Sequence, residues 1–391
     1  MKLAELTDDH RVVVCLGSGG VGKTTTSAAI ALQAAMAGRR TLCLTIDPAK
    51  RLANSLGLSA LNHEPQRIEP ALLTQHGLQC KGELWAMMLD MKHTFDELVA
   101  RHASSEAQQK RILENRIYQY VSTSLAGTQE YMAMEKLHAV HHDLRWDFIV
   151  LDTPPTTNAL DFLDAPQKLV GAIDSPVMRW FVDQLEGNRG IGLLGKGAAF
   201  VLKGLSRFTG VEFLHQVGGF VTDLNELFGG FRERAQAVYD DLRKDDVAFL
   251  IVTSPAPLSV GEAVYFSRKL DQYGIRPRGM VVNRVHPALP EAVGESGALE
   301  QGLEASLAQL LESSVDAEAL AAKLRRAAEA GRAMAERDRE GLRRLREHVA
   351  ASMSYTEIPA FARDVHDLQA LAIVGAHLTG AEPERAGAAQ S

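Results

Sequence analysis

The chain has 391 residues, 46% of them hydrophobic and 23% charged, and a formal net charge of −7. This composition is typical of a globular protein with a sizeable core, and the length predicts two domains or one large α/β domain with an insert. The charge argues against a nucleic-acid binder, no apolar run approaches the ~20 residues of a transmembrane helix, and residues 1–11 lack the apolar segment of a secretory signal. Three cysteines without a CxxC pair argue against disulfides and a thiolate zinc site, so we expect a cytoplasmic protein.

Short, almost wholly apolar runs recur along the chain and predict strands that are buried on both faces, as in a parallel sheet covered by helices. The runs are 11–16, 41–46, 147–151, 247–252 and 279–282, with weaker candidates at 83–89 and 355–358. Because helical stretches separate them, the pattern predicts a doubly wound α/β fold with a mostly parallel sheet.

Two segments interrupt this alternation. Residues 166–245 are Gly-rich and contain seven of the thirteen Phe residues. Residues 290–353 are rich in Ala, Glu and Arg, which predicts a helical region that is largely exposed to solvent. Residues 379–391 are small and polar, and we expect a disordered tail there.

The sequence Gly-Ser-Gly-Gly-Val-Gly-Lys-Thr at 17–24 fits the phosphate-loop motif G-x-x-x-x-G-K-[ST]. It follows the strand predicted at 11–16 and precedes an Ala-rich helix that ends near Gly38. Backbone N–H groups and the helix N-terminus would bind phosphates, Lys23 would reach the β- and γ-phosphates, and Thr24 would offer a hydroxyl to Mg²⁺. The predicted nucleotide-binding residues of this loop are Gly17, Ser18, Gly19, Gly20, Val21, Gly22, Lys23, Thr24 and Thr25.

Three polar residues follow predicted strands directly: Asp47, Asp152 and Asn283. In α/β folds of this kind the site lies at the carboxyl ends of the strands. Each residue alone would also suit a cap or a turn, but three such positions beside a phosphate loop favour a functional reading.

Further motifs follow in chain order, namely 45–52 (T-I-D-P-A-K-R-L), 126–130 (A-G-T-Q-E), 152–160 (D-T-P-P-T-T-N-A-L), 162–166 (F-L-D-A-P), 281–284 (V-V-N-R), 358–361 (I-P-A-F) and 364–368 (D-V-H-D-L). Together with the phosphate loop they resemble the ArsA-type deviant-Walker ATPases. That family includes arsenite-pump ATPases and the targeting ATPase for tail-anchored membrane proteins, and it belongs to the SIMIBI-type P-loop NTPases with MinD and ParA. The resemblance covers most of residues 11–376 and is closest to single-unit bacterial members, the anion-transporting ATPases.

The resemblance implies one P-loop ATPase domain over residues 1–378 that uses ATP and Mg²⁺. By this resemblance Asp47 would orient or deprotonate the attacking water, and Lys23 would act with it in catalysis. Asp152 would hold a Mg²⁺-bound water, so that Thr24 and Asp152 form the metal site. The adenine contacts would be Asn283 and Pro359. The expected assembly is a homodimer or a paired heterodimer with a related ATPase subunit.

Three departures from the family pattern matter. Ser18 replaces the signature lysine that in the family reaches the partner's nucleotide. A paired chain, Lys50 or Arg189 would then have to supply the cation. Alternatively, hydrolysis is slow, or the serine is simply tolerated. The zinc-bridging CxxC and the arsenite-binding cysteines are missing, which argues against a zinc-clamped dimer and an arsenite ligand. Asn158 replaces the histidine of the second switch and cannot carry a proton at neutral pH.

By the same resemblance, residues 166–245 would form a helical insert, since they occupy the place of the helical client-binding subdomain of the tail-anchored targeting relatives. We therefore expect an ATP-hydrolysing dimer whose nucleotide state switches a helical client or effector surface at 166–245. That segment would alternatively pack on itself or contact a membrane. Two other functions stay open: a nucleotide-binding regulatory subunit with little hydrolysis, which Ser18 suggests, and a positioning ATPase like MinD or ParA. His138, His141 and His142 have near-helical spacing and would bind a metal or, more simply, end a helix.

Overall fold

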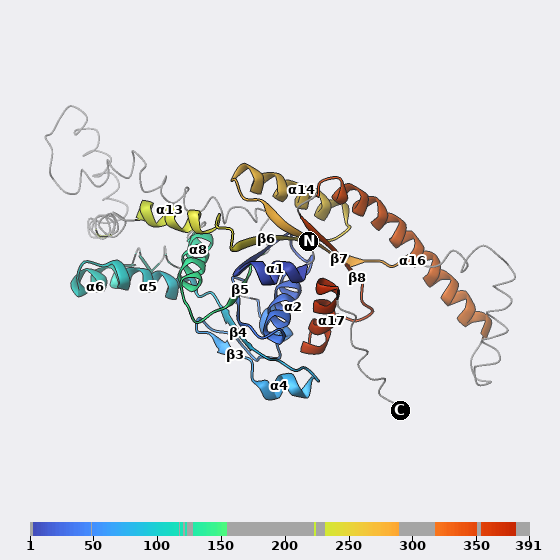
Figure 1. Cartoon of the computed structure of the whole chain (residues 1–391), viewed down its shortest axis with the longest axis horizontal. Coiled ribbons are helices and arrows are strands. Elements are labelled where there is room, and N and C mark those ends of the chain that lie inside the picture. The colour runs from blue at the N-terminus through green and yellow to red at the C-terminus, as the bar shows by residue number, and fades with distance from the viewer. Residues whose placement is uncertain are drawn as a thin grey trace, which may run out of the picture.

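The computed structural model describes residues 3–154 (apart from 48, 117, 120–121 and 123–127), 223, 231–288, 317–349 and 353–380. Its centre is an eight-stranded sheet in the order β3-β4-β2-β5-β1-β6-β7-β8 (Figure 1). Every strand pair is parallel except β3–β4 at one edge. The strands are β1 (Val12–Leu16), β2 (Arg40–Thr45), β3 (Gln66–Arg67), β4 (Glu83–Met88), β5 (Phe148–Asp152), β6 (Val247–Thr253), β7 (Pro277–Val285) and β8 (Ser354–Pro359).

The prediction of a doubly wound, mostly parallel α/β fold is confirmed. Each of the seven apolar runs forms a strand, including the two weaker candidates at 83–89 and 355–358. The sequence analysis missed β3, which has only two residues, both polar, and pairs antiparallel with β4. A strand this short has no periodicity that a pattern search can detect.

The apolar runs lack polar alternation because helices cover both faces of the sheet. Along β1, Val12, Val14 and Leu16 face one core cluster, whereas Val13 and Cys15 face the other. The second cluster contains residues of α1 (Leu3–Asp9), α2 (Lys23–Met36), α3 (Arg51–Ser55), α4 (Pro70–Gln75) and α17 (Leu368–Thr379). The first contains residues of α8 (Thr128–His141), α13 (Phe231–Asp241), α14 (Pro257–Gln272) and α16 (Ala317–Arg346).

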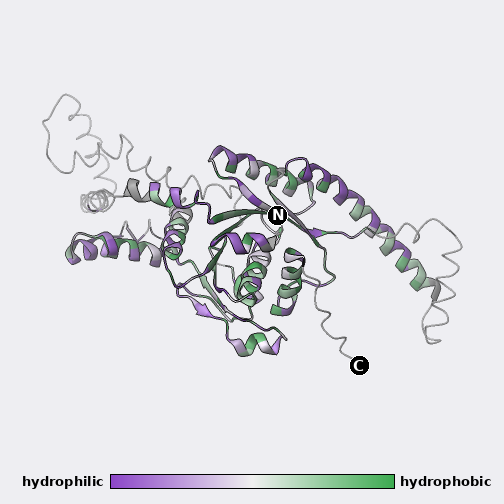
Figure 2. Cartoon of the chain, viewed as in Figure 1, coloured by the Kyte–Doolittle hydropathy of each residue, from purple (hydrophilic) through white to green (hydrophobic). Residues whose placement is uncertain are grey.

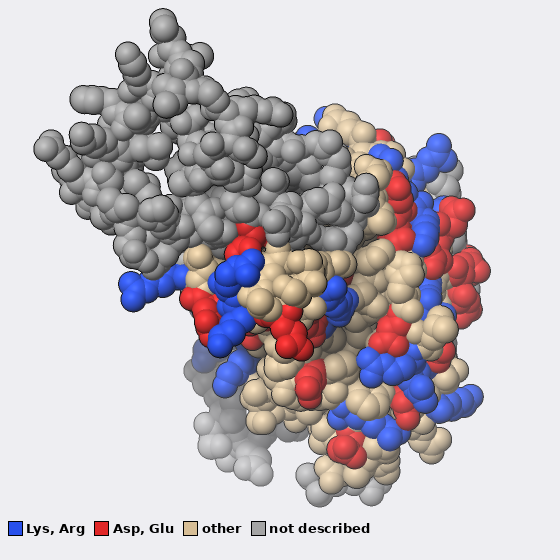
Figure 3. Space-filling model, turned by 90° about the vertical axis from the view of Figure 1, so that its left-hand side faces the viewer, with Lys and Arg blue, Asp and Glu red and all other residues tan. Residues whose placement is uncertain are grey.

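Two further helices, α5 (Met91–His102) and α6 (Glu106–Glu114), extend from the α8 side of the sheet (Figure 1). Helix α16 runs outward from the sheet, and hydrophilic and hydrophobic residues alternate along it (Figure 2). None of the helices in the described ranges is both long and apolar enough to cross a membrane. On the face drawn in Figure 3, Lys and Arg lie next to Asp and Glu, so neither sign of charge collects over the described residues there.

Several predicted features lie outside the described residues. Most of the predicted insert at 166–245 does so, together with Asn158 and Arg189. The same holds for residues 290–316 of the second predicted helical region and for 381–391 of the predicted tail.

Candidate functional site

The phosphate loop connects the carboxyl end of β1 to the first residue of α2. Gly17 passes so close to β6 that a Cβ atom there would lie 2.0 Å from the carbonyl oxygen of Val252. Gly22 caps α2 with φ +96°, and a Cβ atom there would lie 2.2 Å from Nδ2 of Asn283. Side chains at these two positions would therefore clash with the adjacent strand ends, so the loop geometry depends on glycine.

Lys23 lies almost buried at the start of α2, with 5% of its surface exposed. Its Nζ donates a hydrogen bond to the carbonyl oxygen of Ser18 at 2.8 Å, across the loop. Burial lowers the pKa of Lys23, whereas the nearby Asp152 and Asp47 act in the opposite direction. The hydroxyl of Ser18 is also buried and contacts no hydrogen-bond partner among the described residues.

Asp152 is fully buried at the carboxyl end of β5, between β1 and β2. The sheet register pairs it with Cys15 on one side and Thr45 on the other. Its Oδ2 accepts hydrogen bonds from the hydroxyls of Thr24 at 2.8 Å and Thr45 at 2.9 Å. One carboxylate oxygen therefore joins the phosphate loop to the end of β2.

The other oxygen of Asp152, Oδ1, is buried without a hydrogen-bond partner in the described part of the chain. Burial raises the pKa of Asp152 to about 6, although hydrogen bonds from Thr24 and Thr45 oppose the shift. A buried carboxylate oxygen without a partner beside the Thr24 hydroxyl suits Mg²⁺, which prefers oxygen ligands and retains several waters. The residues present therefore fit a magnesium site.

Asp47 follows β2 and lies next to this pair of hydrogen bonds. Its backbone N–H donates to the hydroxyl of Thr45 at 3.2 Å, and its Oδ1 accepts from the backbone N–H of Ala49 at 2.9 Å. Its Oδ2 lies 3.5 Å from Nη1 of Arg51, which is 61% exposed. The sequence analysis missed Arg51, although its i,i+4 spacing from Asp47 is a signal for such a pair. Lys50, the predicted candidate, is an exposed residue at the N-cap of α3.

The two predicted adenine contacts lie on neighbouring strands, Asn283 in β7 and Pro359 at the end of β8. Nδ2 of Asn283 donates to the carbonyl oxygen of Val21 at 2.9 Å, and its Oδ1 accepts from the backbone N–H of Arg284. Arg284 has φ +60°, which is uncommon for a residue with a side chain. Asn283 thus holds the phosphate loop against β7, a contact that the sequence motif did not predict.

A phosphate loop at the carboxyl edge of a doubly wound sheet, with carboxylates at the ends of adjacent strands, defines a P-loop nucleotide-binding protein. The model of the family described as anion-transporting ATPase matches residues 10–312, and the chain belongs to this family. The predicted resemblance to ArsA-type ATPases is therefore confirmed, and the protein is an ATPase.

Several named proteins are similar to the chain over most of its length. ATPase GET3 of Podospora anserina is 26% identical over 274 residues, which cover 69% of this chain and 71% of that protein. The putative arsenical pump-driving ATPase 2 of Aquifex aeolicus is 25% identical over 288 residues, which cover 72% of this chain and 82% of that protein. ATPase ASNA1 homolog 1 of Paramecium tetraurelia is 26% identical over 272 residues, which cover 69% and 73% respectively.

Proposed function

We propose that the chain hydrolyses ATP to ADP and phosphate at the carboxyl edge of its sheet, and that Lys23, Thr24, Asp47 and Asp152 carry the reaction. The observation that supports this most is the shared oxygen of Asp152, which accepts from Thr24 and Thr45 at 2.8 and 2.9 Å. Because Thr45 also accepts from the backbone N–H of Asp47, an unbroken series of hydrogen bonds connects Thr24 of the phosphate loop to Asp47.

In this proposal each group has a separate task. Thr24, through its hydroxyl, and Asp152 would hold Mg²⁺, and the ion would supply charge neutralisation at the phosphates. Lys23 leaves the carbonyl of Ser18 and contacts the same phosphates, which the backbone N–H groups of the loop surround. Asp47 orients or deprotonates the attacking water, so catalysis consists mainly of positioning and charge neutralisation.

Ser18 removes one cation from this arrangement, and we propose that Arg51 supplies positive charge in its place. Arg51 is exposed, lies 3.5 Å from the carboxylate of Asp47, and is close enough to Lys23 for its charge to lower the pKa of that lysine. A paired chain that carries the lysine is the other source of this charge.

We further propose that the protein works as a dimer whose nucleotide state changes a helical client or effector surface within residues 166–245. In each chain the adenine ring would contact Asn283, near the end of β7, and Pro359, at the end of β8. If the surface responds to nucleotide, exchange of ADP for ATP should alter amide hydrogen exchange between residues 166 and 245. Unchanged protection there would argue for a self-packed segment.

Substitution of Asp47 tests the proposed reaction directly. Asp47→Asn in the full chain should retain ATP binding and lower turnover at least about a hundredfold, the range found for general acid–base groups. Asp271→Asn, which removes an exposed carboxylate from the last turn of α14, is the matched control and should leave turnover unchanged. Full turnover in Asp47→Asn would remove Asp47 from this role.

A second function, that of a regulatory subunit with little hydrolysis of its own, is favoured by Ser18 alone. The two functions differ in what the purified chain does without a partner. Steady turnover with Mg²⁺ and ATP, together with ATP-dependent dimerisation in light scattering, supports the enzyme. Turnover near zero that a co-purified related ATPase restores supports the regulatory subunit.

A further inference from the structure

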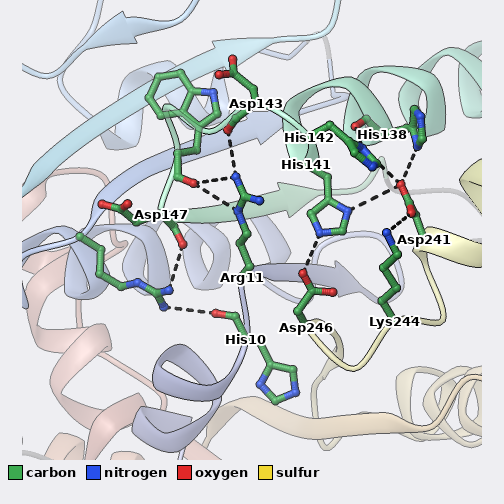
Figure 4. Close-up of polar contacts among 12 residues, drawn as sticks. His10, Arg11, His138, His141, His142, Asp143, Asp147, Asp241, Lys244 and Asp246 are labelled. Atoms are coloured by element: carbon green, nitrogen blue, oxygen red, sulfur yellow. Dashed lines mark hydrogen bonds and ion pairs between the residues drawn. The ribbon is translucent and has the colours of Figure 1, made fainter.

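A cluster of histidines and carboxylates lies where α8 and α13 lead into the amino ends of β5 and β6 (Figure 4). The phosphate loop, in contrast, follows the carboxyl end of β1. Helix α8 ends at His141 and leads to the amino end of β5, whereas α13 ends at Asp241 and leads to the amino end of β6. His138 and His142 are four residues apart, which places both on one face at the C-terminal end of α8. The fold thus brings together side chains that are about a hundred positions apart in the sequence.

Three imidazole rings converge on a single oxygen of Asp241. The Nδ1 atoms of His138, His142 and His141 lie 2.6, 3.5 and 3.7 Å from Oδ2. The other oxygen, Oδ1, forms an ion pair with Nζ of Lys244 at 2.6 Å. Burial opposes the ionisation of Asp241, yet the contacts with Lys244 and His138 hold its pKa below the ordinary value. One oxygen of Asp241 therefore lies close to three imidazole nitrogens, while the other contacts the ammonium group of Lys244.

His141 has the arrangement of a histidine that is oriented for a cation. Only 6% of it is exposed, and its Nε2 lies 2.8 Å from a carboxylate oxygen of Asp246. Because an ionised carboxylate only accepts, Nε2 donates to Asp246, and Nδ1 is the nitrogen that faces Asp241. A cation between Nδ1 and Oδ2 of Asp241, which lie 3.7 Å apart, would be close to both atoms. A carboxylate on the far nitrogen is also the common support of metal-binding histidines.

We propose that His138, His142 and Asp241 bind a divalent transition-metal ion of the zinc class, with His141 beside it. Their ligand atoms all lie within 4.8 Å of one another. A tetrahedral ion with bonds of about 2.0–2.1 Å needs donor atoms roughly 3.3 Å apart. To bind it, the imidazoles would have to rotate, His138 would give up its contact with Oδ2 of Asp241, and any ligation through Nδ1 of His142 would replace its contact with the carbonyl of His138. Two imidazoles and one carboxylate suit zinc rather than magnesium or calcium, which take oxygen ligands.

The bound ion ties the end of α8 to the end of α13. These two helices pack on the same face of the sheet, and each leads directly into a central strand. The ion would displace the contact between Nδ1 of His138 and Oδ2 of Asp241, whereas Lys244 could still contact Oδ1 of Asp241 and His141 could still contact Asp246. The site lies at the amino ends of β5 and β6, away from the phosphate loop at the carboxyl end of β1.

Titration of the full chain with ZnCl₂ tests the site. The protein is first stripped with a chelator, and Zn²⁺ is then titrated against a chromophoric competitor in excess Mg²⁺, which saturates oxygen-only sites. We expect one saturable site per chain, and a visible absorption spectrum of four-coordinate Co²⁺ when CoCl₂ replaces zinc. His142→Gln removes a ligand at a half-exposed position and should weaken zinc binding at least about tenfold.

His348→Gln is the matched control. His348 is also an exposed histidine just beyond a helix end, and its Nδ1 contacts the carbonyl of Arg344 at 2.9 Å, as Nδ1 of His142 contacts that of His138. Zinc affinity should not change in this variant. In thermal unfolding, zinc should stabilise the wild type and His348→Gln, and it should not stabilise the double variant His138→Gln/His142→Gln. Absence of a saturable zinc site in the wild type, or equal affinity in His142→Gln, would overturn the proposal and leave the cluster as a hydrogen-bond network.

Discussion

At the residue scale, the carboxylate of Asp152 connects two segments of the proposed nucleotide site, the phosphate loop and the end of β2. It is buried, it joins Thr24 to Thr45, and it keeps one oxygen without a partner among the described residues. Its pKa of about 6 lies above the ordinary value of 3.8 because burial disfavours the charged form. The ionised carboxylate therefore lowers stability in the absence of a cation.

The sign of this effect predicts how pH changes the response to Mg²⁺. In the ion-free protein, protonated Asp152 favours the folded state. This contribution to the free energy of unfolding is complete below pH 3.8 and is lost as pH rises through about 6, a difference on the order of 3 kcal/mol. If Asp152 holds Mg²⁺ as proposed, the ion favours the ionised form, so with ADP present Mg²⁺ should raise the unfolding temperature more at about pH 7.5 than at about pH 5. Thermal unfolding with and without MgCl₂ measures the difference.

Asp152→Asn provides the control for this prediction. The amide of Asn does not titrate in this range. In this variant the Mg²⁺-induced rise in unfolding temperature should therefore lose the difference between about pH 7.5 and about pH 5 that is due to Asp152. An increment in unfolding temperature that is larger at the lower pH in the wild type would contradict the assignment of Asp152 to the metal site.

At the scale of single elements, the phosphate loop shows how a local motif depends on a distant strand. The motif alone identifies residues 17–24, and the start of α2 at Lys23 agrees with it. The close contacts come from elsewhere in the chain, since Gly17 lies against the carbonyl of Val252 and Gly22 against the amide of Asn283. The loop is thus shaped by β6 and β7 as much as by its own sequence.

A pair of glycine substitutions tests this dependence. Gly22→Ala introduces a Cβ at φ +96° and 2.2 Å from Asn283, so we expect a loss of at least about 1–2 kcal/mol of stability and of most ATP binding. Gly261→Ala is the control, because Gly261 lies in α14 with no atom within 4 Å of the added Cβ. Alanine there should leave ATP binding unchanged and stabilise the helix by up to about 1 kcal/mol. Chemical denaturation and nucleotide titration measure both, and equal behaviour of the two variants would contradict the contact.

At the scale of the whole molecule, the two covered faces of the sheet determine which groups solvent can reach. Cys15 and Cys43 are fully buried on one face, and burial raises the pKa of both thiols, that of Cys15 to about 12. Cys80 is only partly buried, and its pKa is raised by burial as well. Because the thiolate is the reactive form, all three should react slowly at neutral pH, and the first two only after unfolding.

Alkylation followed by mass spectrometry checks this expectation. Iodoacetamide should modify only Cys80 in the native chain and all three cysteines in denaturant, and Cys80→Ser should abolish the native reaction. If Cys15 reacted as fast as Cys80, the sheet would have to open far more readily than its packing implies.

The sequence by itself determined the strands, the phosphate loop and the family. Long apolar runs reveal burial on both faces, and the phosphate-loop motif has a fixed spacing, so both are readable without any contact between distant residues. It did not reveal β3, which is too short to have a pattern, or Arg51, whose pairing with Asp47 was overlooked beside Lys50.

Only the tertiary structure decided which of these groups meet. The strand order places β5 between β2 and β1, so that Asp152 lies between Thr24 and Thr45. The same fold brings His138 to within 2.6 Å of Asp241, a contact with no trace in either local sequence. Local patterns record how each segment is buried, whereas contacts between segments depend on the order and register in which the whole sheet is assembled.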